Sequence, residues 1–132
     1  GLSMSKPHIR VVAARIEREG SFLITQRNAH AVLPLLWEFP GGRVEEGESD
    51  EAALQRELAE NLGIKATVDT LSIHVCHEYD RYHLDMVVYH VSTSDTPSAK
   101  SVNDVQWVHP SNFGDYTFPG ADQQTVDALL GE

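Results

Sequence analysis

The chain has 132 residues, with 20 Asp or Glu against 10 Lys or Arg, so its formal net charge at pH 7 is −10. This charge argues against a basic nucleic-acid-binding surface and against binding to an anionic membrane. No apolar run approaches the roughly 18 residues of a membrane span, and the opening residues lack a secretory pattern, so we expect no leader. The single cysteine excludes an internal disulfide, and we expect a cytoplasmic protein.

The length is typical of one domain, which we place at residues 4–132. Gly1 to Ser3 precede Met4 and resemble a cloning remnant, so they are left out of the fold prediction. No internal repeat or low-complexity tract divides the remainder. A monomer and a homodimer are both compatible with the sequence.

Residues 8–16 and 21–26 are rich in apolar and β-branched side chains, and a polar segment joins them, which predicts a β-hairpin. Arg27 follows the second strand. It is either a surface arginine or a ligand for phosphate oxygens or a base edge, which a guanidinium group suits. The apolar run that follows contains Trp37, which we expect to pack in the core rather than to stack on a base. The segment Phe39-Pro40-Gly41-Gly42 predicts a chain reversal in which glycine lets the backbone approach a ligand or ion.

A helix is predicted over residues 50–62, because Ser49 is a favourable N-cap and Gly63 a favourable C-terminal stop. Glu57, Glu60 and position 61 share one face of this helix. The adjacent face carries a buried stripe of three leucines. These leucines are Leu54, Leu58 and Leu62.

Carboxylates crowd this helix and the loop before it. Like charges one turn apart destabilise a helix by about 0.2–0.5 kcal/mol per pair, and the dipole disfavours anions near the C-terminal end. One interpretation is a solvated acidic face. The neighbouring glycine pair favours another, a hard divalent cation such as Mg²⁺ bound by carboxylates, a backbone carbonyl and substrate phosphates. The seven acidic residues are Glu45, Glu46, Glu48, Asp50, Glu51, Glu57 and Glu60.

Residues 66–78 and 82–93 predict a second hairpin, residues 94–103 a mobile loop, and residues 105–108 a short strand. Histidines gather in this hairpin without matching a zinc-site spacing. Alternation places His74 and Cys76 on one face and His77 and His83 on the other. We therefore expect no transition-metal site there, and an inert, half-buried thiol at position 76. These four residues are His74, Cys76, His77 and His83.

The chain ends with a turn, Phe118 to Asp122, that leads into a helix over residues 123–130. Asp122 either favours the helix start through the dipole or has a role in binding. An aspartate accepts hydrogen bonds from groups such as an exocyclic amine, unless a dry pocket keeps it protonated.

The segment from Gly42 to Ile64 resembles the Nudix box, in which Gly, Glu, Arg-Glu, an aliphatic residue, Glu-Glu and Gly-aliphatic recur at fixed spacing. One position departs, because Asn61 stands where the family has the second glutamate of the Glu-Glu pair. The resemblance is to the Nudix hydrolase superfamily and its MutT-like members. It implies an α+β fold, an α/β/α sandwich with a mixed sheet. The matching residues are Gly42, Glu48, Arg56, Glu57, Leu58, Glu60, Gly63 and Ile64.

The resemblance also implies two sets of site residues in the box. Arg56 would orient the glutamates through paired hydrogen bonds, one carboxylate would act as the base, and Glu48 would support the loop or a second metal. The catalytic set is Glu57, Glu60 and Arg56, and the metal-binding set is Gly41, Glu57, Glu60, Asn61 and Glu48.

Three positions outside the box are also implied by the resemblance. Arg27 would contact the nucleotide, because MutT-like proteins carry an arginine eleven residues before the glutamate of Glu-Phe-Pro-Gly-Gly. Asp122 would hydrogen-bond the base. Ser101 stands where a further metal-binding glutamate is common, and Asp104 could substitute for it if the loop folds differently.

The function implied is hydrolysis of a nucleoside triphosphate to the monophosphate and pyrophosphate with Mg²⁺ or Mn²⁺. A damaged or non-standard purine nucleotide and a cytidine-type nucleotide are both candidate substrates. The alternative is a nucleotide-binding or regulatory module with weak or no turnover, because Asn61 and Ser101 both reduce the charge of the metal shell.

Overall fold

The computed structural model describes residues 6–132, so the cloning remnant predicted at Gly1 to Ser3 lies outside the described residues. The elements follow one another along the chain in this order: β1 (His8–Arg18), β2 (Ser21–Gln26), β3 (Trp37–Glu38), β4 (Gly41–Arg43), α1 (Asp50–Leu62), β5 (Thr67–Glu78), β6 (His83–Ser92), β7 (Asp104–Val108), the 3₁₀ helix η1 (Pro110–Asp115) and α2 (Gly120–Leu130). Both predicted hairpins are present. The C-terminal helix begins at Gly120, three residues before the predicted start.

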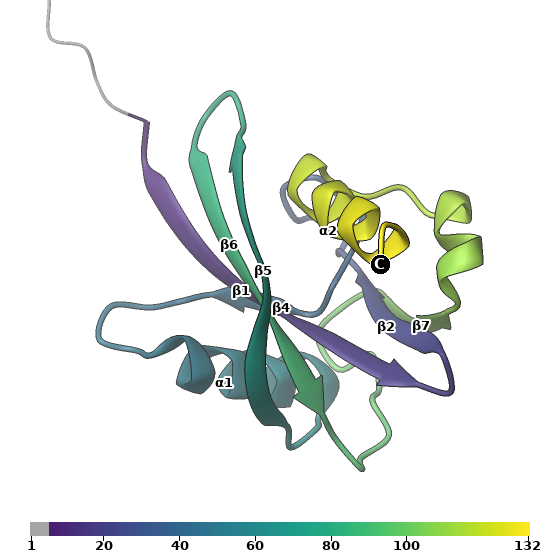
Figure 1. Cartoon of the computed structure of the whole chain (residues 1–132). Coiled ribbons are helices and arrows are strands. Elements are labelled where there is room, and N and C mark those ends of the chain that lie inside the picture. The colour runs from purple at the N-terminus through teal and green to yellow at the C-terminus, as the bar shows by residue number, and fades with distance from the viewer. Residues whose placement is uncertain (1–5) are drawn as a thin grey trace, which may run out of the picture.

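The strands form one mixed sheet in the order β3-β2-β1-β6-β5, with β4 also paired to β1 and β7 paired to β2. The β1–β6 pair is parallel, and the other pairs are antiparallel. β1 joins the two halves of the sheet, because it pairs with β6 from His8 to Ile16 and with β2 only at Glu17 and Arg18. Figure 1 shows β2 and β7 turned away from β6 and β5 on either side of this long strand.

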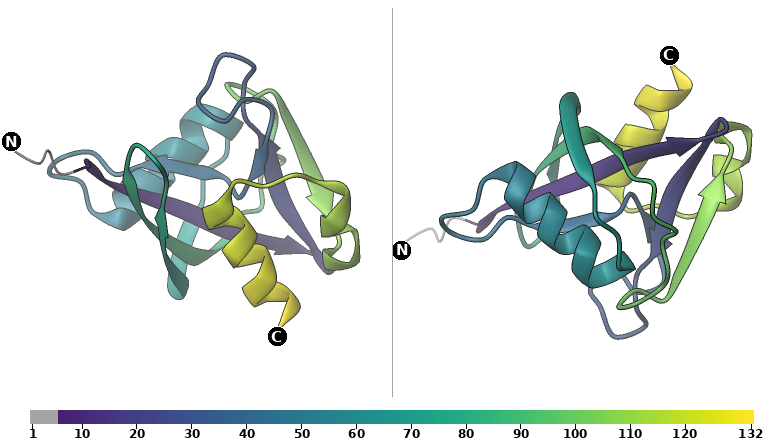
Figure 2. Two further views of the ribbon diagram at one scale, coloured as in Figure 1. Left: turned by 90° about the horizontal axis from the view of Figure 1, so that it is seen from above. Right: turned by 90° about the horizontal axis from the view of Figure 1, so that it is seen from below.

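The two α-helices cover opposite faces of the sheet (Figures 1 and 2). The leucine stripe of α1 is fully buried against the Val12 and Ala14 face of β1. α2 packs on the other face through Val126 and Leu129, together with aromatic side chains of η1 and its flanks. Burial of one such leucine contributes about 1.5–3 kcal/mol. The predicted α/β/α sandwich with a mixed sheet is confirmed.

The caps of α1 agree with the prediction. The Ser49 hydroxyl accepts a hydrogen bond from the Ala52 N–H at 3.1 Å, and Gly63 ends the helix with φ of 68°. Glycine adopts this left-handed backbone conformation without steric strain, and the Gly63 N–H donates to the Ala59 carbonyl. Local capping chemistry therefore fixes the length of the helix that carries the box.

The segment Phe39 to Gly42 was predicted to reverse the chain. The chain bends at Pro40, but Gly41 and Gly42 do not form a turn and lie in β4, antiparallel to β1. Glycine is needed there because the strand is crowded on both sides. A Cβ on Gly41 would lie 1.9 Å from the Val12 carbonyl oxygen, and a Cβ on Gly42 would lie 2.3 Å from Cδ of Glu57. The close approach is to the protein itself, and it brings the Gly41 carbonyl beside α1.

The segment 94–103 was predicted to be a mobile loop, but hydrogen bonds hold its second half against the end of α1. The N–H groups of Lys100 and Ser101 donate to the Asn61 carbonyl at 3.0 and 3.1 Å, and Ser98 donates to Leu62 at 3.0 Å. The last carbonyls of a helix have no partner within it. This loop satisfies them. Within residues 6–132, no helix is long and apolar enough to cross a membrane.

Candidate active site

Arg56 is the centre of the hydrogen-bond network on α1. Its Nε and Nη2 donate to the two carboxylate oxygens of Glu48, both at 2.8 Å, and its Nη1 donates to Glu57 Oε1 at 2.9 Å. Such paired guanidinium–carboxylate bonds fix the orientation of both groups. The structure therefore brings Arg56 to the glutamates as predicted, with the paired bonds going to Glu48.

Both Glu48 oxygens are used by the protein. They accept from Arg56, and Oε1 also accepts the Glu45 N–H at 2.9 Å. The Arg56 hydrogen bonds, assisted by Glu45, lower the pKa of Glu48 to about 2. This arrangement matches the loop-supporting role, because Glu48 ties the loop before α1 to the helix.

Glu57, Asn61 and Gly41 lie together and are partly buried. Asn61 Nδ2 donates to Glu57 Oε2 at 2.9 Å and to the Gly41 carbonyl at 3.4 Å. The Glu60 carboxylate lies 3.5 Å from Arg56 Nη1, and its side chain is 60% exposed. Three of the five predicted metal-binding residues, Gly41, Glu57 and Asn61, thus form one hydrogen-bonded cluster, and Glu60 and Glu48 are joined to it through Arg56.

The oxygens of this cluster suit a hard divalent cation, because Mg²⁺ binds one or two carboxylates and takes its remaining ligands from water and phosphate. Glu57, Glu60 and the Gly41 carbonyl provide such oxygens. Asn61 differs from the prediction, because its amide nitrogen and not its oxygen faces Glu57 and Gly41. The donor set fits the cation, with Asn61 as a hydrogen-bond donor to the ligands.

Ser101 lies in contact with Asn61. Its hydroxyl donates to Asn61 Oδ1 at 2.7 Å and approaches the Glu60 carbonyl at 3.2 Å. The two residues that replace expected glutamates are therefore neighbours. Asp104 does not take their place, because its carboxylate hydrogen-bonds within β7, to the Val105 N–H and to Gln106.

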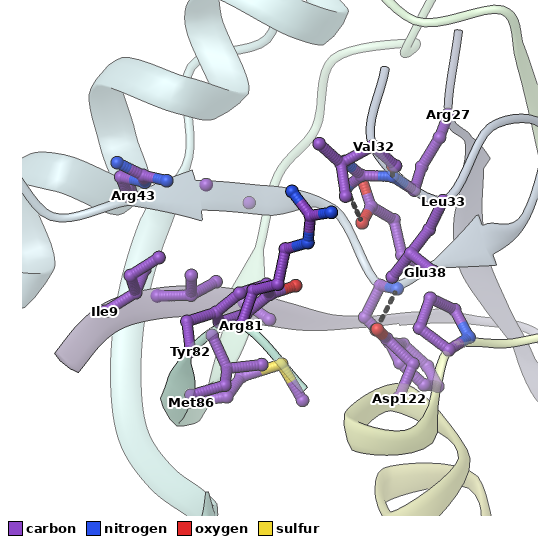
Figure 3. Close-up of a pocket in the computed structure, with 17 residues that line it drawn as sticks. Ile9, Arg27, Val32, Leu33, Glu38, Arg43, Arg81, Tyr82, Met86 and Asp122 are labelled. Carbon is purple, nitrogen blue, oxygen red and sulfur yellow. Dashed lines mark hydrogen bonds and ion pairs between the residues drawn. The ribbon is translucent and has the colours of Figure 1, made fainter. Parts of the chain in front are cut away.

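A cavity of about 460 Å³ opens beside the box (Figure 3). Arg27 and Asp122, the two predicted substrate-binding residues, both line it. Gly41 and Gly42 line it as well, so β4 forms a wall shared by the cavity and the cluster of predicted metal-binding residues. Its volume is in the range of small-molecule sites. The remaining polar lining includes Glu38, Arg43, Arg81 and Tyr82.

The polar end of the cavity holds Arg27, Glu38 and Asp122. Arg27 Nη1 lies 2.9 Å from Glu38 Oε2, and Arg27 Nε donates to the Val32 carbonyl at 2.6 Å. Asp122 is 6% exposed and accepts the Phe39 N–H at 3.1 Å. Arg27 is thus held in place by Glu38, which the sequence did not identify as its partner.

Burial raises the pKa of Asp122 well above its ordinary value, and the nearby Glu38 carboxylate raises it further. Burial also raises the pKa of Glu38, against the opposing effect of Arg27. Two neighbouring carboxyl groups disfavour double ionisation. Asp122 therefore has access to the protonated form, which donates as well as accepts a hydrogen bond.

The sequence did not predict three charged residues of this cavity, Glu38, Arg43 and Arg81. The signal for Glu38 was a lone carboxylate between two aromatic residues of an apolar run. Arg43 follows the glycine pair directly, and Arg81 lies in the turn of the second hairpin. Trp37 behaves as predicted, because it packs edge-on against Tyr116 at 5.0 Å between ring centroids.

Two expectations for the second hairpin are wrong. Cys76 is exposed rather than half-buried, because α1 does not extend over this end of β5. His83 was placed on the face opposite His74, but the register pairs it with Glu78, two residues from Cys76. Directly paired residues point to the same face. His83 therefore shares the face of His74 and Cys76.

The fold is an α/β/α sandwich with a mixed sheet. In it β4, which contains Gly41 and Gly42, lies against α1, which carries Arg56 and Glu57, and a cavity opens beside them. This arrangement defines the Nudix hydrolase fold. A model of the NUDIX domain matches residues 11–128, and the chain belongs to this family. The CTP pyrophosphohydrolase of Escherichia coli (strain K12) is 37% identical over 123 residues, which are 92% of this chain and 91% of that protein. An 8-oxo-dGTP diphosphatase of Haemophilus influenzae is 33% identical over 98% of this chain and 96% of its own length.

Solved structures show the same fold. The solution structure of the E. coli ORF135 protein is 36% identical, with a TM-score of 0.83 over 99% of this chain and 94% of that chain. The crystal structure of the MutT protein from Methanosarcina mazei Go1 is 24% identical, with a TM-score of 0.86 over 96% and 95%. The second is similar in fold alone.

Proposed function

We propose that this protein hydrolyses a nucleoside triphosphate to the monophosphate and pyrophosphate, with Mg²⁺ as the cofactor and Mn²⁺ as its substitute. The observation that carries the proposal is the shared wall at Gly41 and Gly42. It places the Glu57 carboxylate next to a nucleotide-sized cavity that holds Arg27 and Asp122. The names of the relatives support the same substrate class.

Glu57, Glu60 and the Gly41 carbonyl would hold the cation, with Glu48 and Asn61 next to them. When bound, the cation neutralises phosphate charge and makes water a better nucleophile. Glu57 is fixed by Arg56 on one oxygen and by Asn61 on the other. Glu57 or Glu60 accepts the proton of the attacking water, as the water oxygen bonds to phosphorus and the bond to the pyrophosphate oxygen breaks.

The base would lie at the polar end of the cavity. A cytosine edge presents an amine donor beside a ring-nitrogen acceptor, which a protonated carboxyl group matches with its carbonyl and its hydroxyl. An ionised carboxylate only accepts, and it suits the adjacent N–H donors of a guanine-type edge. The raised pKa of Asp122 therefore supports a base with an amine donor beside a ring-nitrogen acceptor, a pattern that cytosine and adenine share. The name of the CTP pyrophosphohydrolase relative makes a cytidine-type triphosphate the first candidate, with an oxidised purine triphosphate as the second.

The test is pyrophosphate release from a panel of CTP, dCTP, 8-oxo-dGTP, GTP and ATP, each with Mg²⁺ and with Mn²⁺. We expect the protein to release pyrophosphate from at least one of these nucleotides, and only when the metal is present. Tight nucleotide binding without turnover across the panel would refute hydrolysis and favour the binding module. In that case the structural cause of the missing turnover would be the pair Asn61 and Ser101, since neither residue brings the charge of a glutamate.

A further inference from the structure

A second cluster of metal-ligating side chains lies outside the nucleotide cavity, on β5 and β6. In the register of these strands Cys76 pairs with Asp85, and His74 is two residues before Cys76 on the same face. Their ligand atoms, an imidazole nitrogen, a thiol sulfur and a carboxylate oxygen, all lie within 4.8 Å of one another. The sheet backbone therefore holds three different donors around one point.

The contacts inside the cluster show how closely the donors converge. His74 Nε2 contacts Asp85 Oδ1, and Cys76 Sγ lies 3.9 Å from the same nitrogen. A surface His–Asp pair would account for two of these groups, but not for a thiol that faces the same nitrogen. Sequence spacing could not indicate the site, because the third ligand comes from the next strand.

Arg10 orients the carboxylate from the other side. Its Nη1 donates to Asp85 Oδ2 at 2.9 Å, which leaves Oδ1 directed towards His74. Arg10 also pairs with Asp50 at 2.7 Å, so its positive charge is balanced within the network. Hydrogen bonds of this kind to ligating carboxylates support metal sites.

The cluster is separate from the candidate active site. Leu84 and Met86, the neighbours of Asp85 on β6, both line the nucleotide cavity. Successive side chains of a strand point to opposite faces. Asp85 and its partners therefore lie on the face that α1 covers, beyond the start of that helix.

We propose that His74, Cys76 and Asp85 bind a borderline-soft divalent cation of the Zn²⁺ or Co²⁺ type, with a fourth position open to water or another small ligand. Thiolate and imidazole select such ions over Mg²⁺, whose ligands are oxygens. The cation displaces the thiol proton of Cys76 and bonds to the thiolate, with no change in oxidation state. The His74 side chain is 50% exposed, so an ion can reach the site from solvent.

The test is a titration of the intact protein with Co²⁺ in excess Mg²⁺, which keeps the oxygen ligands of the box occupied. A thiolate-to-cobalt charge-transfer band can report only Cys76, because the chain has one cysteine. We expect a band that saturates at one ion per chain. Zn²⁺ should abolish it and should slow the alkylation of Cys76 by a thiol reagent.

Variants separate a three-ligand site from a thiol that binds metal alone. Cys76→Ser should remove the band, and His74→Ala should weaken Co²⁺ binding by more than about 100-fold, beyond the usual loss for an outer-shell partner. His77→Ala, a histidine of the same strand on the other face, is the matched control and should bind as the parent does. Absence of the band in the parent, or equal affinity in His74→Ala and the parent, would overturn the proposal.

Discussion

The substitution Gly42→Ala tests whether the position of the Glu57 carboxylate governs the reaction. A Cβ at this position would lie 2.3 Å from Glu57 Cδ and 2.5 and 2.6 Å from its two oxygens. Ordinary contacts of a Cβ begin at 3.4 Å, so the carboxylate must move by about 1 Å. It can move, because it ends a flexible side chain, but in moving it loses its hydrogen bonds to Arg56 and Asn61.

A displacement of about 1 Å at a reacting group can cost on the order of 100-fold in rate. We therefore expect kcat for pyrophosphate release to fall by about that factor. The loss of these two part-buried hydrogen bonds should lower the thermal unfolding midpoint by a few degrees. The backbone adds no strain, because Gly42 does not have a positive φ. The measurements are kcat and KM with the best nucleotide of the panel and saturating Mg²⁺, together with a thermal melt.

Gly114→Ala is the matched control. Nothing lies within 4 Å of a Cβ built there, and its backbone also lacks a positive φ. The control should retain the parental kcat and unfolding midpoint. If Gly42→Ala retained the parental kcat as well, the position of Glu57 would not govern the reaction, and the role assigned to it here would be refuted.

Three further predictions address single side chains. Glu57→Gln should lower kcat by several orders of magnitude with an unchanged melt, and near-normal turnover would remove Glu57 from the mechanism. Asn61→Glu should tighten Mg²⁺ binding or raise kcat, measured by metal titration of the activity, and no change in either would place position 61 outside the metal shell. Asp122 has a raised pKa when folded, so the stability it contributes is present in acid and is lost as pH rises through that pKa. The unfolding midpoint of Asp122→Asn relative to the parent should therefore rise from acid to neutral pH, and a constant difference would contradict the raised pKa.

The helices and hairpins were predictable because their signals are local. Ser49 and Gly63 cap α1 within one turn of its ends, and the spacing of its leucines selects the buried face. The resemblance of the box to a family then supplied the arrangement of these elements into layers, which periodicity alone does not determine. Local capping and periodicity therefore predict the helices and hairpins, and the family resemblance predicts how they pack into layers.

The rest of the site depends on contacts between distant segments. Glu38 becomes part of a carboxyl pair only because α2 places Asp122 against Phe39, the residue that follows β3. Asn61 turns its amide nitrogen to Glu57 because Ser101, forty residues further on, donates to its oxygen. Neither contact has a sequence pattern of its own, so the pKa of Asp122 and the orientation of Asn61 could not be predicted.

The cavity also resolves a conflict in the charge of the molecule, because a net charge of −10 should repel a nucleoside triphosphate. Three of the ten basic residues, Arg27, Arg43 and Arg81, line this one cavity. Arg27 is paired with Glu38, whereas Arg43 and Arg81 have no side-chain ion pair among residues 6–132. Exposed charges are screened beyond about 8 Å at physiological salt. A triphosphate at the mouth of the cavity would therefore respond to these two nearby guanidinium groups more than to the acidic surface behind them.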